Sequence, residues 1–363
     1  MPFLLLVTIT LVVSAFSKFG YKFALFISAI GLLLTPAVIG IDYSAQTHDV
    51  EVWSGRVVDW KHKDAWDEWV PPVTTCTSDD KGRQTCTTTP GYWIHHPAEN
   101  YVKTSDDGWK RVRGSLDGKV KFNDKYPRTA EELKKYFPEN MPTASTHSYV
   151  NKVNASYSIY KNEDVDLKEY PDLPEYPRKV NNYFFVDRIL GKVPNKKVAL
   201  ERLAEHNSEL NKMIPDPENE GKNRSYKQVN IIFVNVGENK DESYGFALQD
   251  SWKNGNKNDF IVSFSMNKDG KINWVYPFSW SEVELLKLEV RDYMLDLGAV
   301  NDFVPVIDEV AKLVEDKFER KEFADFNYLQ IDVSTPAIVI LWILHGILII
   351  AYFYLILTNW RFR

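Results

Sequence analysis

Uncharged apolar runs mark both ends of the chain. Residues 2–16 form a short run, residues 23–41 a longer one, and residues 336–357 a third run that contains one histidine, His345. A helix needs about 20 apolar residues to cross the hydrocarbon core of a bilayer. The second and third runs therefore predict transmembrane helices, the third over residues 336–358.

The first run is shorter and admits two interpretations. It is either a span that forms a helical hairpin with the second run, or a signal-peptide core, because Val13-Ser14-Ala15 resembles a cleavage site. We prefer the span, since secretory signals normally open with Lys or Arg and Met1-Pro2-Phe3 carries only an α-amino group. The N-terminal membrane segments are thus predicted over residues 1–41.

Positive charges beside the apolar runs predict the orientation, because Lys and Arg flanking a span tend to stay in the cytoplasm. Lys18 and Lys22 lie between the first two runs, and Arg361 and Arg363 follow the third. Placing these four in the cytoplasm puts residues 42–335 on the other side. All 50 acidic residues and all but four of the 44 basic residues fall there, so this outer region is acidic. We predict a multi-pass membrane protein whose bulk is extracytoplasmic, in the periplasm if the host is bacterial.

Composition fits a largely globular outer region. The chain has 363 residues, of which 44% are hydrophobic and 26% are charged, which is enough for two ordinary domains. The formal charge is −6 and no basic tract stands out, which excludes a nucleic-acid partner. Membrane lipid and other membrane or envelope proteins are the partners that we expect.

The two cysteines lie in a segment that is nearly palindromic in threonine. A hairpin turn at Asp80-Lys81-Gly82 places Cys76 opposite Cys86, at a spacing that a disulfide tolerates. Two unrelated buried thiols are the alternative, but threonine-flanked hairpin positions are a poor place to bury them. A structural disulfide requires an oxidising compartment, in agreement with the predicted orientation.

Residues 42–169 predict a β-rich outer domain. Apolar and polar residues alternate over 50–53 and 56–60, as in half-buried strands. Six of the eleven tryptophans fall in this region, and we expect them to pack in its core rather than to form a groove for sugar or peptide. These are Trp53, Trp60, Trp66, Trp69, Trp93 and Trp109.

A proline-rich stretch separates the two outer domains. Pro171, Pro174 and Pro177 recur at every third position of residues 170–178, which predicts a stiff, extended linker. Residues 179–335 then alternate helical and strand patterns, which predicts helices covering a small mixed sheet. The predicted fold is an α+β membrane protein with transmembrane helices at both ends.

The second outer domain resembles the TPM domain family over residues 180–318. The segment Val180-Asn181-Asn182-Tyr183 is similar to the opening of that family, and the apolar strand pattern of residues 229–236 follows at a similar spacing. Further similar positions are Trp252, Gly255, Lys257-Asn258-Asp259 and Asp302-Phe303. The resemblance implies an αβα sandwich on the extracytoplasmic face of a membrane, followed by a C-terminal span.

The resemblance also implies two kinds of function. Some members bind metal or have weak phosphatase activity, and others assist the assembly or maintenance of membrane complexes. A divalent metal would have Asp259, Glu282 and Asp302 as candidate ligands. The sequence departs from the family here, because Asn258-Asp259 reverses the usual order and Phe260 replaces a glycine. A solvated loop acid is the interpretation that we prefer for each ligand, and we expect neither catalysis nor a bound cofactor.

Histidines offer two further candidate sites. His62, His95 and His96 have the chemistry of a zinc or copper site, but adjacent residues of a strand point to opposite faces, so a surface loop is the preferred interpretation. His345 lies within a predicted span, where an ionisable group is costly. Gly346 beside it permits close helix packing, so we predict that His345 donates a hydrogen bond to residues 23–41 or to a partner's helix.

Together these patterns predict a membrane-anchored extracytoplasmic accessory or binding protein that supports the assembly or maintenance of a membrane or envelope complex. A membrane-tethered, metal-dependent, phosphatase-like hydrolase is the alternative.

Overall fold

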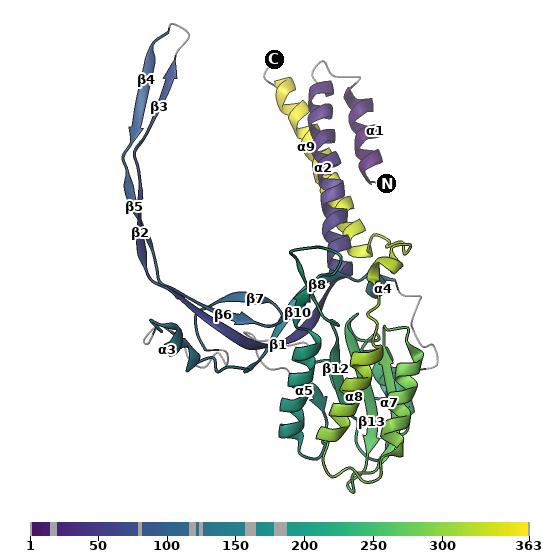
Figure 1. Cartoon of the computed structure of the whole chain (residues 1–363). Coiled ribbons are helices and arrows are strands. Elements are labelled where there is room, and N and C mark those ends of the chain that lie inside the picture. Colours follow the sequence, from purple (N-terminus) through teal and green to yellow (C-terminus); the bar gives the residue numbers. More distant parts are fainter. Residues whose placement is uncertain are drawn as a thin grey trace. The chain divides into compact units, whose positions relative to one another are not determined.

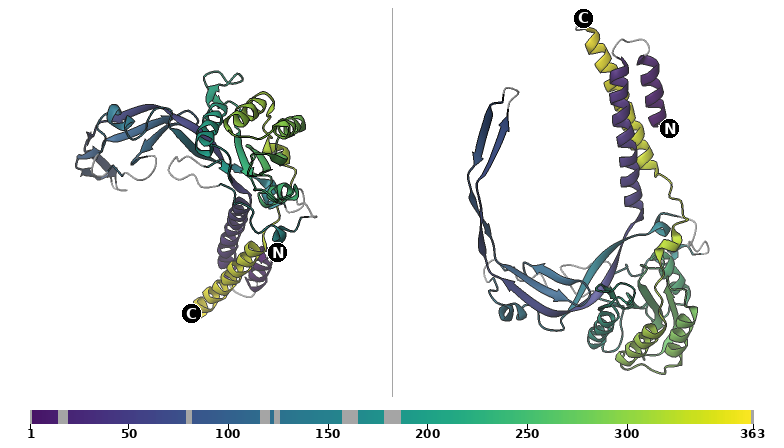
Figure 2. Two further views of the ribbon diagram at one scale, coloured as in Figure 1. Left: turned by 90° about the horizontal axis from the view of Figure 1, so that it is seen from below. Right: turned by 45° about the horizontal axis from the view of Figure 1, so that its top comes forward.

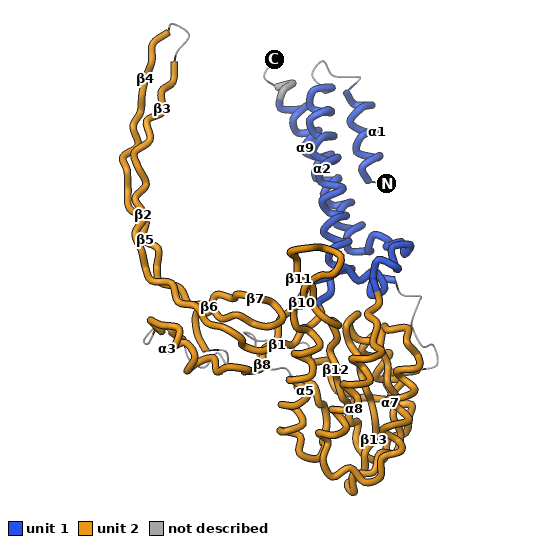
Figure 3. Tube along the Cα trace, in the orientation of Figure 1, with its two compact units in different colours: residues 1–50, 148–162, 322–363 blue, residues 51–147, 163–321 orange. Residues whose placement is uncertain are grey.

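The computed structural model describes residues 2–14, 20–78, 82–115, 121–122, 126–156, 165–177 and 187–361. The chain is a mixed α+β protein, as predicted (Figure 1). It divides into two compact units (Figure 3). The first contains residues 1–50, 148–162 and 322–363, and the second contains residues 51–147 and 163–321.

Three helices dominate the first unit. They are α1 (Pro2–Ser14), α2 (Gly20–Thr47) and α9 (Thr335–Arg361). Two stretches, Tyr21–Thr47 and Thr335–Thr358, are long and apolar enough to cross a membrane. The shorter α1 packs against both long helices, and the buried side chains between the three are Leu6, Ala24, Ile27 and Tyr352.

Two short helices also belong to this unit. They are α4 (Lys152–Ala155) and the 3₁₀ helix η2 (Phe323–Phe326). Asp49 Oδ2 accepts hydrogen bonds from the side chains of Asn151 and Tyr149, and Tyr149 packs edge-on against Phe323. These contacts explain why residues 148–156 and 322–334, which the sequence pattern assigns to the outer domains, group with the apolar helices.

The N-terminal part of the second unit contains a four-stranded sheet with the order β7-β6-β1-β8. Its strands are β7 (Gly108–Val112), β6 (Glu99–Thr104), β1 (His48–Lys63) and β8 (Pro142–Val150). The helix α3 (Ala130–Lys134) packs here, and its capping residue Thr129 accepts a hydrogen bond from the Glu132 amide. Val57, Val102, Phe122, Leu133 and Phe137 form the small core.

A two-stranded ribbon continues from β1 and β6 (Figure 2). Strand β2 (Trp66–Val70) pairs with β5 (Tyr92–His96), and β3 (Val73–Ser78) pairs with β4 (Gln84–Thr89). Its side chains are exposed along most of its length.

The expectation that the tryptophans pack in a core is wrong for four of them, of which Trp109 on β7 is 44% exposed. Trp66, Trp69 and Trp93 lie on the ribbon and are 56%, 47% and 66% exposed. Within the described part of the chain no second layer covers these strands, so their rings have no core to enter.

The C-terminal part of the second unit is built on a sheet with the order β14-β13-β12-β9. Strands β9 (Ile189–Leu190), β12 (Asn230–Asn235) and β13 (Asp259–Met266) are parallel, and β14 (Ile272–Ser279) is antiparallel to β13. The short strands β10 (Met213–Pro215) and β11 (Asn223–Ser225) form a separate pair.

Helices cover both faces of this sheet. The larger cluster joins it to α5 (Lys196–Leu210), α7 (Glu284–Asp296) and α8 (Val304–Lys317). The smaller cluster joins the other face to α6 (Ser243–Ser251).

The proline-rich segment is packed rather than free. It follows the 3₁₀ helix η1 (Leu167–Glu169), and Leu173 and Tyr176 join the smaller hydrophobic cluster beside α6. The indole Nε1 of Trp252 donates a 2.9 Å hydrogen bond to the carbonyl of Pro174. Residues 171–172 form a turn. The segment is anchored to the sheet domain because Leu173 and Tyr176, which lie between the prolines, pack on this cluster.

Candidate functional site

The three predicted metal ligands are distributed over both ends of the sheet. Asp259 begins β13, and Glu282 follows β14, whose Ser279 is paired with Phe260. Asp302 follows the Lys271–Ala299 bridge, which lies at the opposite end of β13. Eight strand residues extend roughly 23 Å, so Asp302 cannot share an ion with the other two. Among the described residues, no group of three or more His, Cys, Asp or Glu side chains is arranged to hold a metal ion.

Asp259 is fully buried, so the expectation of a solvated loop acid is wrong for this residue. Its carboxylate accepts 2.7 Å hydrogen bonds from the Tyr176 hydroxyl, the Asn230 side chain and the Asn256 amide. Burial raises the pKa of Asp259 to about 6, although these hydrogen bonds favour the charged form. Arg188, itself buried, also opposes this rise through its positive charge.

This network is a structural anchor rather than an open site. Tyr176 comes from the proline-rich segment, and its hydroxyl also accepts a 2.8 Å hydrogen bond from the Asn256 side chain. Gly255 has φ of +72°, and a Cβ there would lie 2.8 Å from Asp259 Oδ2. A glycine is therefore required to bring the loop this close to the carboxylate.

The other two acids serve surface contacts. The side chain of Glu282 is 77% exposed and forms an ion pair with Lys321. Asp302 Oδ1 accepts a 3.2 Å hydrogen bond from the amide of Val304, at the start of α8. None of the described contacts of Glu282 or Asp302 involves Asp259.

A groove of about 810 Å³ lies at the carboxyl ends of β9, β12 and β13. The side chain of Asn235 connects residues of the groove lining. It donates a 2.6 Å hydrogen bond to the carbonyl of Lys192 and accepts a 2.9 Å hydrogen bond from the amide of Gly237. Lys268 and Glu238 form an ion pair across its lining. Ligands often bind at this edge of an α/β sheet. The described lining, however, includes no His, Cys, Ser or Thr, so it offers no hydroxyl or thiol nucleophile beside a histidine base.

Strands β2 and β5 form the part of the ribbon that we call the ribbon base. It presents aromatic side chains on each of its two faces. On one face Trp69 and Trp93 lie opposite each other, with ring centroids 5.1 Å apart. The neighbouring pair on that face is Asp67 and His95, whose Oδ1 and Nδ1 atoms are 2.6 Å apart. Aromatic rings therefore stand beside a carboxylate on an exposed two-stranded surface.

The opposite face repeats this chemistry. Trp66 stacks on His96 with 4.2 Å between ring centroids, and His96 Nε2 lies 2.8 Å from Glu68 Oε2. His95 and His96 thus point to opposite faces, as strand geometry predicts, but they lie on β5 rather than in a loop. His62 has separate partners, Asn100 and Asp64. The structure does not bring the three histidines together.

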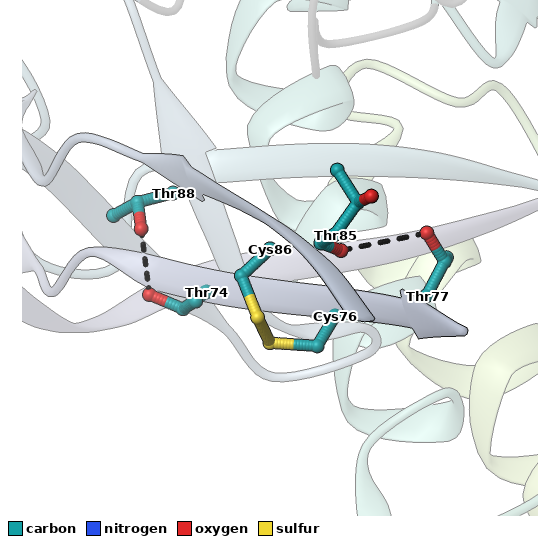
Figure 4. Close-up of a disulfide and its surroundings, with 6 residues drawn as sticks. All are labelled: Thr74, Cys76, Thr77, Thr85, Cys86 and Thr88. Atoms are coloured by element: carbon teal, nitrogen blue, oxygen red, sulfur yellow. Dashed lines mark hydrogen bonds between the residues drawn. A yellow bond between two sulfur atoms is a disulfide. The ribbon is translucent and has the colours of Figure 1, made fainter. Parts of the chain in front are cut away.

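The predicted disulfide is present near the end of the ribbon. Cys76 and Cys86 are bonded, with Cα atoms 4.0 Å apart (Figure 4). Thr74 and Thr88 pair beside it through their hydroxyls at 2.9 Å. Gly82 has φ of +75°, as the turn requires, while residues 79–81 lie outside the described residues.

His345 is buried between α9 and α2. Its Nδ1 lies 2.8 Å from the carbonyl of Leu341, and its Nε2 lies 3.2 Å from Thr35 Oγ1. A carbonyl only accepts, so Nδ1 carries a proton and donates to Leu341, while the Thr35 hydroxyl also donates to the carbonyl of Gly31 at 2.8 Å. His345 therefore contacts α2 of its own chain, as predicted, and it also donates a hydrogen bond within its own helix.

Comparison with protein-family models, with curated proteins and with solved structures finds no match for this chain. The resemblance to the TPM domain family stays a prediction. Its opening segment, Val180 to Tyr183, lies outside the described residues.

Proposed function

We propose that this chain is a membrane-anchored extracytoplasmic accessory protein that binds another membrane or envelope protein through the β2–β5 ribbon. The observation that carries the proposal is the exposure of four large aromatic side chains on strands that have no covering layer among the described residues. They are Trp66, Trp69, Tyr92 and Trp93.

Exposed aromatic clusters are typical of binding surfaces. Tryptophan and tyrosine are enriched among the residues that contribute most to protein interfaces, because they combine a large apolar ring with a polar group. Burying one large apolar side chain contributes about 1.5–3 kcal/mol. The rings on this ribbon are mostly exposed, so they obtain little of this burial free energy within the chain. Most of it would be released when a partner covers them.

The anchor and the compartment have separate support. Two apolar helices meet the length and composition requirements of a membrane span. The outer region is acidic, positive charges flank the apolar runs, and the ribbon holds a disulfide, which persists in oxidising compartments.

The alternative, a metal-dependent phosphatase-like hydrolase, lacks a comparable observation. Asp259 is enclosed by its hydrogen-bond partners, and Glu282 and Asp302 lie at different ends of the sheet. We therefore propose a non-enzymatic role for the described residues.

Purification of the full chain from native membranes tests the binding role. A variant with Trp69→Ala and Trp93→Ala should recover co-purifying protein at least tenfold less well than the unchanged chain. Trp109→Ala is the matched control, because Trp109 is 44% exposed on β7, outside the ribbon. Equal recovery by the ribbon variant would overturn the proposal.

Reporter fusions test the location. A reporter active only outside the cytoplasm should work after Asp42 and near Gln330, and should fail after Arg363. Activity of the Arg363 fusion would contradict the orientation without affecting the ribbon argument.

A further inference from the structure

We propose that two copies of this chain associate by pairing the outer backbone edges of their β3–β4 ribbons. This self-association goes beyond the binding role of the ribbon base, because it uses different strands and backbone rather than aromatic groups.

The ribbon end has two open edges. In the described part of the chain β3 and β4 pair only with each other. The Cα atoms of Cys76 and Cys86 are 4.0 Å apart, closer to the roughly 4.5 Å of a non-hydrogen-bonded antiparallel pair than to the 5.5 Å of a hydrogen-bonded one. Residues in such pairs direct their N–H and C=O groups away from the partner strand.

The same alternation applies two residues along each strand. Thr74 is paired with Thr88 and Ser78 with Gln84, so these residues also present backbone groups to the outside. Each edge therefore offers three residues whose N–H and C=O groups are available to a further strand.

These edges have little of the protection that natural edge strands usually carry. Lysines, charged side chains or prolines normally prevent edge-to-edge pairing. Neither Val73–Ser78 nor Gln84–Thr89 contains any of these, and Pro72 and Pro90 stand only at their ends. The strands are instead rich in β-branched residues, which favour sheet formation.

A second copy is the occupant that fits this chemistry best. The two strands already hold together by placing threonine opposite threonine, with Thr75 facing Thr87 and Thr77 facing Thr85. An identical edge offers the same pairing again. Elsewhere the acidic outer region makes copies repel, whereas these two strands carry no charge.

The disulfide prepares the edge for binding. A one-residue slip would turn every side chain to the opposite face of the ribbon. The Cys76–Cys86 bond fixes the register before association, which lowers the ordering cost. Because an isolated two-stranded hairpin is marginally stable, joining two ribbons into four strands would stabilise both.

The test measures the molar mass of the full chain and of two double variants in detergent, by light scattering after size-exclusion chromatography. In the first, Thr74→Pro with Thr88→Pro removes an outward N–H from each edge and spares the inward hydrogen bonds. In the second, Thr74→Val with Thr88→Val loses the same pair of hydroxyls but keeps both N–H groups. Circular dichroism and an intact disulfide on mass spectrometry check that each ribbon is folded.

The unchanged chain and the valine variant should be dimeric, and the proline variant should dissociate with a Kd raised at least tenfold. A monomeric unchanged chain would overturn the proposal. So would a proline variant that dimerises as well as the unchanged chain, since that result would place the association in the apolar helices.

A photo-crosslinker provides a second measurement that does not rely on proline. Placed at Gln84 on the ribbon, it should join two copies. Placed at Val198, which is 56% exposed on α5, it should not. Capture only of a different protein at position 84 would mean that the edge serves another partner, and would also overturn the proposal.

Discussion

The hydroxyl of Tyr176 donates a 2.7 Å hydrogen bond to Oδ2 of Asp259 and thereby ties the proline-rich segment to the first residue of β13. Asp259 is fully buried and Tyr176 is partly buried, and burial also raises the pKa of Tyr176. The segment that looks like a linker in the sequence is thus part of the sheet domain.

Removing this hydroxyl should destabilise the domain. Tyr176→Phe leaves a buried carboxylate short of one donor, so the free energy of unfolding should fall by about 1–3 kcal/mol. Urea unfolding of the full chain in detergent, followed by tryptophan fluorescence, measures the change. Tyr328→Phe is the matched control, because Tyr328 is 70% exposed and should leave the midpoint unchanged. An unchanged midpoint for Tyr176→Phe would show that the segment is not held by this bond.

The buried carboxylate also predicts a pH dependence. Burial raises the pKa of Asp259 from its ordinary value of 3.8 to about 6 in the folded state. Between these pH values the folded chain binds more protons than the unfolded chain, so stability falls as the pH rises. Protonation of Asp259 stabilises the folded chain by about 3 kcal/mol. This stabilisation is fully present below about pH 4 and is lost above about pH 6.

Comparison with Asp259→Asn isolates this effect from the other carboxylates. Asparagine is neutral at every pH, so the stability of the unchanged chain relative to the variant should decrease between pH 4 and pH 7. Urea midpoints at several pH values measure the difference. A difference that stays constant over this range would mean that Asp259 ionises in the folded state as readily as an exposed aspartate.

Local features of the sequence predicted local structure well. The disulfide followed from the spacing of Cys76 and Cys86 around a turn, and the two long apolar helices followed from uninterrupted apolar runs. These features depend on neighbours along the chain, which the sequence displays directly.

Features that depend on distant parts of the chain were missed. Alternation identifies a strand but does not say whether another layer covers it, so the sequence predicts for Trp69 and Trp93 a core that the ribbon lacks. The burial of Asp259 depends on Tyr176, which is 83 residues away in the sequence. The one local signal was a pair of aromatic residues, Tyr170 and Tyr176, in a segment otherwise typical of a linker.

The disulfide should hold the end of the ribbon together. Replacing Cys76 and Cys86 by serine removes a cross-link that closes a short loop, and such a link contributes about 2–3 kcal/mol. Hydrogen exchange of residues 73–78 and 84–89 should become faster in this variant, while exchange in β12 should not change. For the unchanged chain, mass spectrometry without reducing agent should find the two cysteine peptides linked, and readily alkylated thiols would contradict the structure.

The contact between His345 and Thr35 should stabilise the pairing of α9 with α2. His345→Leu and Thr35→Val each remove one partner of the 3.2 Å contact. Polar contacts between membrane helices contribute about 0.6–2 kcal/mol, so each variant should lower the stability of the helical unit by that amount. Unfolding of the full chain by SDS, followed by circular dichroism, measures it.

The double variant separates this contact from other effects of the two substitutions. If His345 and Thr35 act through each other, the losses of the two single variants will not add, because the second substitution has no contact left to remove. Thr358→Val is the matched control, since Thr358 bonds only carbonyls of its own helix at 2.9 and 3.2 Å in the described contacts. Strictly additive losses would show that the histidine is stabilised by its bond to Leu341 and its packing, and that Thr35 contributes independently of it.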